Sequence, residues 1–319
     1  GCYLKSLMLF SLYATTASLK DIAILNKLEN NTVFGLTKFS DMSKEEFADL
    51  NFMNPSLSFG IKISNLRFVR NLICRPRLKD TALSPSHINY YFTPPVCNDF
   101  RRKQQGVVKP VLDQKLCQGC WAFSIVGVLE SMSAIQLEDY KSRSIEELID
   151  CSSRNNGCYN GSVIIAMDFI CDNTLRFVTA EEYPLTLSMD KNCKPIKGYE
   201  RGRRVKQFKH MCNMNEDVIV KMIATHGPLV VAVDATNWMN YIGGVIERAC
   251  TRGRASHVVQ IVGYERYKEP PVKTPVPYYI VRNSWGLDWG EKGYVKIAIH
   301  DNVCGILFIF RFLIVVSHR

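Results

Sequence analysis

Apolar residues recur at helical spacing in the earlier part of the chain. Leu19, Ile22, Leu25 and Leu28 follow this spacing and predict a helix over residues 17–29. Residues 121–137 are apolar almost all round, a pattern typical of a helix that is buried on every side. Shorter helices are predicted over residues 145–151, 163–170 and 216–226.

After Pro228 the pattern changes to short apolar runs of the kind that form strands. These runs cover residues 229–233, 257–262, 278–282, 293–298 and 306–316. A helical half followed by a strand-rich half predicts an α+β fold in which two subdomains meet at a cleft.

The N-terminal part of the chain differs in character from the rest. Ser43 precedes Glu45 and Glu46, which indicates the N-cap of a helix. Residues 54–95 are irregular and end in Pro94-Pro95, as a linker does. We therefore expect an N-terminal segment over residues 1–95 and a compact domain over residues 96–319.

Composition and charge narrow the class of protein. The chain has 319 residues, 47% hydrophobic and 22% charged, which is typical of a globular protein. The net charge is +10, with basic clusters at residues 101–103 and 201–204. No aromatic residues alternate with these clusters, so they indicate a solvated basic face and no nucleic-acid partner. The apolar runs at residues 2–12 and 306–316 are too short to span a membrane.

The chain contains twelve cysteines, which indicates an oxidising compartment and the secretory pathway. Cys117 and Cys120 have the Cys-x-x-Cys spacing of a dithiol oxidoreductase, but the residues before them lack a thioredoxin-like strand pattern. A zinc site on the same pair would need a second Cys/His pair at ligand spacing. The sequence offers none, so no metal site is expected.

The most informative residues are Cys120, His257 and Asn283. Cys120 precedes the buried helix, where the helix dipole stabilises a thiolate by up to roughly 2 kcal/mol. A protonated His257 beside it would stabilise the thiolate further, and Asn283 would orient the imidazole ring. Trp285 and Trp289 would shield that hydrogen bond from water. Taken singly, each residue fits an ordinary core or turn position, so the hypothesis rests on their joint order and spacing.

These residues and several longer segments resemble the papain-like cysteine proteases, a family whose Cys, His and Asn spacing is known. The resemblance implies a mainly helical subdomain, a β-barrel-like subdomain and an active-site cleft between them. It also implies an endopeptidase that works through an acyl-enzyme thioester. By position, Cys120 would be the nucleophile, His257 the general base and acid, Asn283 its orienter and Gln114 a donor to the oxyanion. The segments that carry the resemblance lie at residues 114–124, 157–162, 227–238, 241–245, 279–286 and 302–306.

The same resemblance implies a precursor form of the protein and a set of binding partners. Residues 39–47 resemble the family's inhibitory propeptide, which occupies the cleft backwards until it is cleaved. No organic cofactor or metal is implied, and the partners would be protein and peptide substrates, the protein's own propeptide and cystatin-like inhibitors. A monomer in the lysosome or outside the cell is expected. The implied disulfides are Cys117–Cys158, Cys151–Cys193 and Cys250–Cys304.

The resemblance also implies a substrate-binding site. By position, the residues that contact substrate would be Gly161, Val163, Ala232, Val258, Trp285 and Ile309. Four of them (Val163, Ala232, Val258 and Ile309) would line the pocket for P2, the second residue before the scissile bond, and predict a hydrophobic P2 side chain. Of the two glycosylation sequons, Asn30 is expected to be modified and Asn160 is not, because a glycan at Asn160 would crowd the cleft.

Two positions depart from the family pattern. Gln118 and Asn160 stand where the family usually has glycine. Gln118 would crowd the site that takes P1, the residue whose carbonyl is attacked. A non-catalytic binding protein with an obstructed cleft is therefore the alternative to an active protease.

Overall fold

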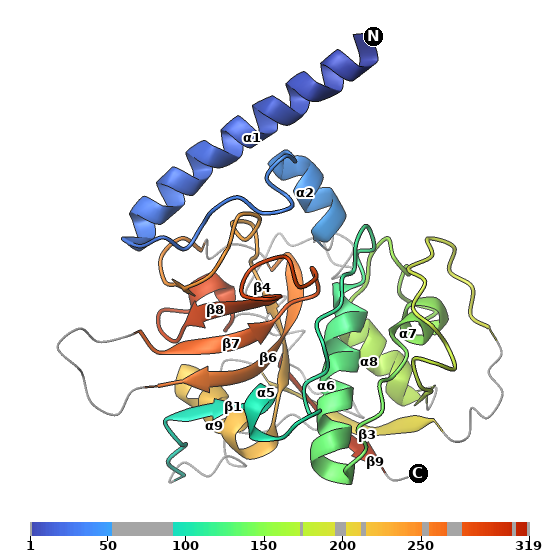
Figure 1. Cartoon of the computed structure of the whole chain (residues 1–319). Coiled ribbons are helices and arrows are strands. Elements are labelled where there is room, and N and C mark those ends of the chain that lie inside the picture. The colour runs from blue at the N-terminus through green and yellow to red at the C-terminus, as the bar shows by residue number, and fades with distance from the viewer. Residues whose placement is uncertain are drawn as a thin grey trace, which may run out of the picture.

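A computed structural model describes residues 2–52, 92–172, 175–194, 202–211, 215–250, 255–266, 276–307 and 311–317. Figure 1 shows a body made of a group of helices beside a twisted sheet, with the first part of the chain lying across its top. This arrangement confirms the α+β class that the sequence predicts.

The N-terminal arm (residues 2–52) contains two helices, α1 (Cys2–Glu29) and α2 (Lys44–Asn51). α1 is longer than the helix predicted over residues 17–29 and projects away from the body (Figure 1). α2 begins where the sequence predicts, because the Ser43 side chain accepts a hydrogen bond from the Glu46 N–H and the Glu46 side chain accepts one from the Ser43 N–H.

The helical subdomain is built on α6 (Cys120–Leu137), which confirms the buried helix predicted over residues 121–137. Within the described part of the chain, one helix, α6, has the length and apolar composition needed to cross a membrane. Most of α6 is buried in the protein core. α7 (Ile145–Cys151) and α8 (Val163–Asp172) match two further predicted helices. The short α5 (Phe100–Lys103) precedes them in the chain. α9 (Glu216–His226) lies in the half of the molecule that contains the sheet (Figure 1).

The strands form one sheet in the order β2-β3-β9-β4-β6-β7-β8-β5, with β1 paired to β6. All neighbours are antiparallel except β5 and β8. The strands are β1 (Cys97–Asp99), β2 (Arg176–Phe177), β3 (Arg203–Met211), β4 (Leu229–Val233), β5 (Val245–Ile246), β6 (His257–Glu265), β7 (Tyr278–Arg282), β8 (Tyr294–Ala298) and β9 (Arg311–Ser317).

Two parts of the sheet differ from the sequence prediction. The strand predicted from residue 306 is wrong at its start, because β9 begins at Arg311 and a 3-10 helix (Val303–Gly305) stands before it. Ile306, the first residue of the predicted strand, has φ −58° and ψ −20°, which are helical and not extended backbone angles. β3, which pairs with β9, has no counterpart among the predicted strands because its sequence carries basic residues in place of an apolar run.

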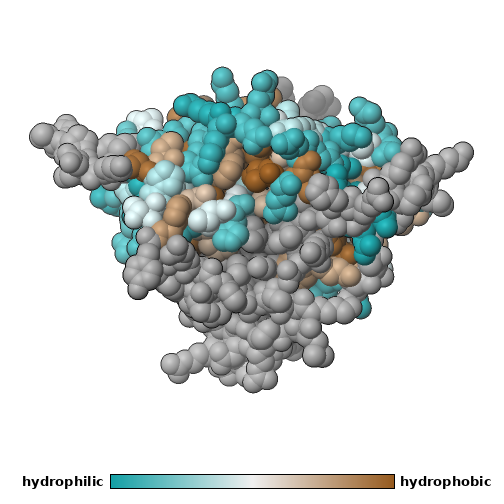
Figure 2. All heavy atoms as spheres, turned by 90° about the horizontal axis from the view of Figure 1, so that it is seen from below, coloured by the Kyte–Doolittle hydropathy of each residue, from teal (hydrophilic) through white to brown (hydrophobic). Residues whose placement is uncertain are grey.

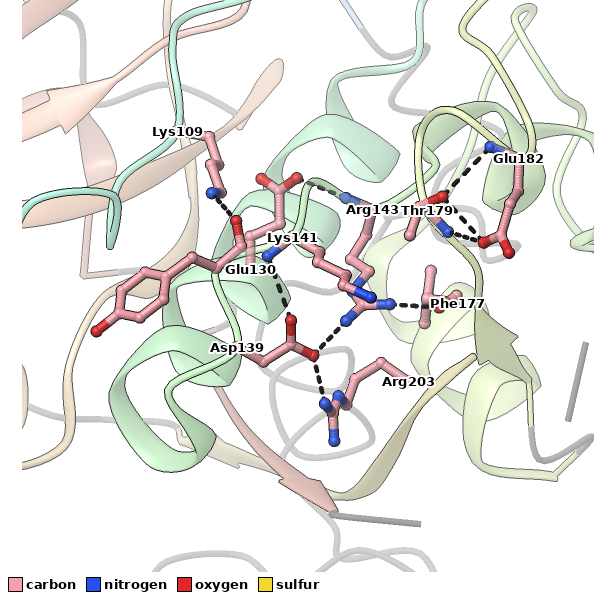
Figure 3. Close-up of polar contacts among 10 residues, drawn as sticks. Lys109, Glu130, Asp139, Lys141, Arg143, Phe177, Thr179, Glu182 and Arg203 are labelled. Carbon is pink, nitrogen blue, oxygen red and sulfur yellow. Dashed lines mark hydrogen bonds and ion pairs between the residues drawn. The ribbon is translucent and has the colours of Figure 1, made fainter. Parts of the chain in front are cut away.

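A buried polar cluster lies at the far end of α6, away from the N-terminal arm. Figure 3 shows Arg143 and Arg203 converging on the Asp139 carboxylate. Glu130, on α6, accepts a hydrogen bond of 2.8 Å from the Arg143 backbone N–H. Viewed from below, the described side chains on this side of the molecule are a mixture of hydrophilic and hydrophobic residues (Figure 2).

Candidate active site

Cys120 is the first residue of α6 and is fully buried. The backbone of Val258 lies within hydrogen-bonding reach of its thiol, so Cys120 lies beside the first residues of β6. Ser124, one turn further along α6, donates a hydrogen bond of 2.9 Å to the Val258 carbonyl. Burial raises the pKa of the Cys120 thiol to about 12, and hydrogen bonds from the backbone N–H groups of Val258, Trp121 and Cys120 lower it only in part.

His257 is the first residue of β6 and is also fully buried. Its Nε2 lies 2.7 Å from Oδ1 of Asn283. The Trp285 ring lies over the imidazole, with 4.8 Å between ring centroids and 31° between planes. Burial lowers the pKa of His257 to about 4, although the Asn283 side-chain oxygen, which accepts from the ring, and the Asn51 backbone both act to raise it. Nδ1, on the other side of the ring, has no hydrogen-bond partner among the described residues.

Comparison with known proteins identifies the family to which the chain belongs. The sequence profile of the family described as "papain family cysteine protease" matches residues 94–308. The chain belongs to the papain family of cysteine proteases. This is a family of hydrolases that act on peptide bonds, so the resemblance drawn from the sequence is confirmed.

Within the family, the chain is similar to cathepsin O. Human cathepsin O is 35% identical over 281 residues, which cover 87% of this chain and 78% of the human protein. Mouse cathepsin O is 38% identical over 213 residues, which cover 66% of this chain and just under two thirds, 65%, of the mouse protein.

Solved structures agree on the fold of the chain, including its N-terminal arm. A digestive procathepsin L2 proteinase from Tenebrio molitor larval midgut matches with a TM-score of 0.75 and 27% identity, covering 96% of this chain and 92% of that protein. A recombinant stem bromelain precursor matches with a TM-score of 0.77 at 24% identity, over 97% of this chain and 92% of that one, which shows the fold alone.

Gln114 lies close to this papain-family constellation. It is buried, and its backbone N–H donates to the Ser284 carbonyl at 2.8 Å, next to Asn283. Its side-chain Nε2 donates to the Cys117 carbonyl at 2.9 Å, and its Oε1 accepts from the Ser284 hydroxyl at 2.5 Å. The carboxamide is therefore fixed between the turn before Cys120 and the segment after Asn283.

The residues expected to contact substrate come from both subdomains. Ala232 and Val258 are cross-strand partners on β4 and β6, and Val163 is the first residue of α8; all three are buried. Gly161 is buried as well, and a Cβ at this position would meet the Trp121 ring at 2.3 Å. Ile309 lies outside the described residues.

The N-terminal arm covers the site, and its contacts include residues that the sequence analysis did not single out. The backbone of Asn51 lies close enough to the His257 imidazole to raise its pKa, and the Phe52 ring lies 6.5 Å from the imidazole. On the other side, the Gln118 side chain donates a hydrogen bond to the Asp49 carbonyl. The segment 49–52 thus lies between the start of α6 and the start of β6. Asn51 and Phe52 carry no sequence signal beyond their position at the end of α2.

Aromatic packing holds α2 against the site. Phe39 and Phe47 both pack edge-on against Trp285, with centroid distances of 5.8 and 5.2 Å. Phe39 and Phe47 also contact each other at 5.2 Å. Because Trp285 in turn packs on His257, the arm adds a second apolar layer over the imidazole.

Within the part of the chain that the structure describes, three disulfides form, Cys117–Cys158, Cys151–Cys193 and Cys250–Cys304, which are the pairs that the resemblance implies. Cys117 is therefore bonded to Cys158, whereas Cys120 is a free thiol. The Cys-x-x-Cys spacing is not a dithiol pair, which removes the basis of the oxidoreductase hypothesis. Cys97 is also a free thiol, and Cys74 and Cys212 lie outside the described residues.

Two further features bear on the expectations from the sequence. Asn30 is exposed at the end of α1, whereas Asn160 is only 4% exposed. Among the described residues, no group of three His, Cys, Asp or Glu side chains could hold a metal ion.

Proposed function

We propose that this protein is a cysteine endopeptidase in which Cys120 is the nucleophile and His257 the general acid and base. The observation that carries the proposal is the 2.7 Å contact between His257 Nε2 and Asn283 Oδ1, with Cys120 at the start of α6 beside Val258. This contact orients the ring so that the other nitrogen, Nδ1, is left for the thiol.

The reaction follows from these positions. The Cys120 thiolate attacks the scissile carbonyl, and a C–S bond forms as the carbonyl oxygen becomes an oxyanion. Gln114 Nε2 and the Cys120 backbone N–H donate to that oxyanion. The His257 imidazolium then protonates the leaving nitrogen, the C–N bond breaks and a thioester remains. Water, deprotonated by neutral His257, hydrolyses the thioester and releases Cys120 and the new carboxylate.

The arm-covered site holds both groups in their neutral forms. Burial raises the pKa of Cys120 and lowers that of His257, so neither ionises readily beneath the arm. Removing the arm would readmit water to both groups and favour the thiolate–imidazolium pair. We infer that residues 1–95 act as an inhibitory propeptide and that residues 96–319 are the peptidase domain.

Substrate preference follows from the buried residues near Cys120. Val163, Ala232 and Val258 are all apolar, which supports a hydrophobic P2 side chain over arginine. A peptide-library profile dominated by arginine at P2 would contradict this assignment. The three disulfides support a secreted or lysosomal location. We expect the enzyme to be a monomer that degrades proteins and is open to cystatin-like inhibitors.

Active-site labelling tests the proposal. The chain is secreted from a eukaryotic host, incubated at mildly acidic pH and treated with a thiol-reactive peptidyl epoxide. We expect one epoxide per chain, on Cys120, appearing as residues 1–95 are lost. Cys120→Ala should abolish labelling, while Cys97→Ala, which removes an exposed free thiol, should leave it unchanged.

The alternative, a non-catalytic binding protein, predicts a different result in this experiment. A processed, folded domain that takes up no epoxide and cleaves no peptide would support the non-catalytic binding protein and remove the proposed function.

A further inference from the structure

Gln118 stands at the edge of the proposed active site, in the turn between a disulfide and the nucleophile's helix. Its backbone N–H donates to the Cys158 carbonyl at 2.8 Å, and the neighbouring Cys117 is bonded to Cys158. Gly119, the N-cap of α6, separates Gln118 from Cys120. The backbone of Gln118 is therefore fixed relative to the thiol.

The side chain of Gln118 contacts the polypeptide that occupies the site. Its Nε2 donates to the main-chain carbonyl of Asp49, and the backbone of Asn51, two residues later, lies beside the His257 imidazole and raises its pKa. The stretch from Asp49 to Asn51 thus reaches from Gln118 to His257. A carboxamide that holds a main-chain carbonyl of the arm can hold a main-chain carbonyl of a substrate in the same place.

The other atom of the carboxamide has no partner. Gln118 Oε1 is buried from water and accepts no hydrogen bond from any described residue. A buried acceptor without a donor is unfavourable, because it has lost its water and gained nothing in exchange. A ligand that brings a donor to this point would relieve that cost, whereas a ligand without one would not.

We propose that Gln118 is a specificity-determining residue that selects a P1 side chain carrying an N–H donor, glutamine above all. Nε2 holds a main-chain carbonyl of the bound peptide, and Oε1 accepts the P1 side-chain amide. This rests on the proposed proteolytic function and makes Gln118 a recognition element of that site, not an obstruction in it.

A matched substrate series tests the proposal on the mature, epoxide-titrated enzyme. The peptides share leucine at P2 and differ only at P1, which is Gln, Met or Glu. Met has a similar length to Gln without polar hydrogens, and Glu replaces the donor with an acceptor. We expect kcat/KM for P1 Gln to exceed that for P1 Met by about tenfold, with P1 Glu lower still.

Variants separate hydrogen bonding from size. Gln118→Met keeps the bulk but removes both polar atoms, and should reduce the Gln-to-Met ratio to about one. Gln118→Gly should reduce the ratio equally while admitting larger P1 side chains. Gln105→Gly, the same change at an exposed position, should leave the ratio as it is.

The outcomes are distinguishable from failure of the proposed function. A wild-type enzyme that neither takes up epoxide nor cleaves any peptide would remove the proteolytic function itself. An enzyme that is active but has equal kcat/KM for P1 Gln and Met, or whose ratio survives in Gln118→Met, would overturn the role of Gln118 alone.

Discussion

At the scale of single residues, the site depends on side chains that are held in place by hydrogen bonds to neighbouring residues. Asn283 Oδ1 accepts from both His257 and the Ser284 backbone N–H, at 2.7 and 2.8 Å. Gln114 is held by Cys117 on one side and Ser284 on the other. Such preorganisation matters for catalysis because the donors need not reorient when charge develops.

Gln114→Ala is therefore expected to lower kcat by about 100-fold with little change in KM, because one oxyanion donor is lost. Steady-state kinetics on epoxide-titrated enzyme measure this. Ser284→Ala is the control, since it removes the contact to Gln114 Oε1 but leaves the donor, and should cost clearly less. Equal kcat for Gln114→Ala and wild type would remove Gln114 from the oxyanion site.

At the scale of elements, the N-terminal arm is held to the domain by main-chain contacts as well as by aromatic packing. Gly35 N–H donates to the Asn240 carbonyl at 2.9 Å, and Ile242 N–H donates to the Val33 carbonyl at 3.0 Å. At the end of α1, the buried Glu29 carboxylate accepts hydrogen bonds from the backbone N–H groups of residues 247, 248 and 249 at 2.6–3.1 Å. Release of the arm must break all of these.

Glu29→Ala is expected to loosen the arm. Hydrogen bonds to a charged group contribute about 1.5–3 kcal/mol each, so losing this set should raise the open population at least about tenfold. The initial rate of Cys120 labelling in the intact, unprocessed chain should rise accordingly. Glu45→Ala, an exposed change in α2, is the control. Identical labelling rates for Glu29→Ala and wild type would show that Glu29 does not hold the arm.

At the scale of the whole molecule, buried carboxyl groups couple stability to pH. Burial raises the pKa of Glu130 to about 7 and that of Glu147 to about 8. The folded state therefore binds more protons than the unfolded state, whose glutamates titrate near 4.5. Their stabilising contribution is complete below about pH 4.5, is lost progressively as pH rises from there, and is gone above about pH 8. His257 acts in the opposite direction between about 6.5 and 4, since its folded pKa is lowered.

Stability should therefore fall between pH 6.5 and pH 8.5, a range in which the glutamates dominate. Thermal unfolding of the inactive Cys120→Ala chain, which cannot digest itself, should give a Tm several degrees lower at pH 8.5. Glu130→Gln in the same background should flatten this dependence, while Glu181→Gln at an exposed position should not. A Tm that does not change across this range would contradict the assignment.

Much of this structure could be predicted from local sequence. The Ser43 cap, the buried α6 and the strands β4 and β7 follow from capping chemistry and apolar periodicity, which act over a few residues. The order of Cys120, His257 and Asn283 was equally visible, and all three lie within residues 94–308, which match the family. The start of β9 was not predicted, because Ile306 has helical backbone angles at the end of the 3-10 helix although it belongs to an apolar run.

The sequence by itself determined the fold class, most helices and strands, and the residue types of the site. Only the tertiary structure decided which distant residues contact the residues of the site and of the arm. The Asn51 backbone meets His257, the Gln118 amide meets Asp49, and Glu29 meets residues 247–249, each across a long stretch of chain. The reason is physical: periodicity and capping are set by neighbours along the chain, whereas burial and hydrogen-bond partners depend on which distant segments pack together.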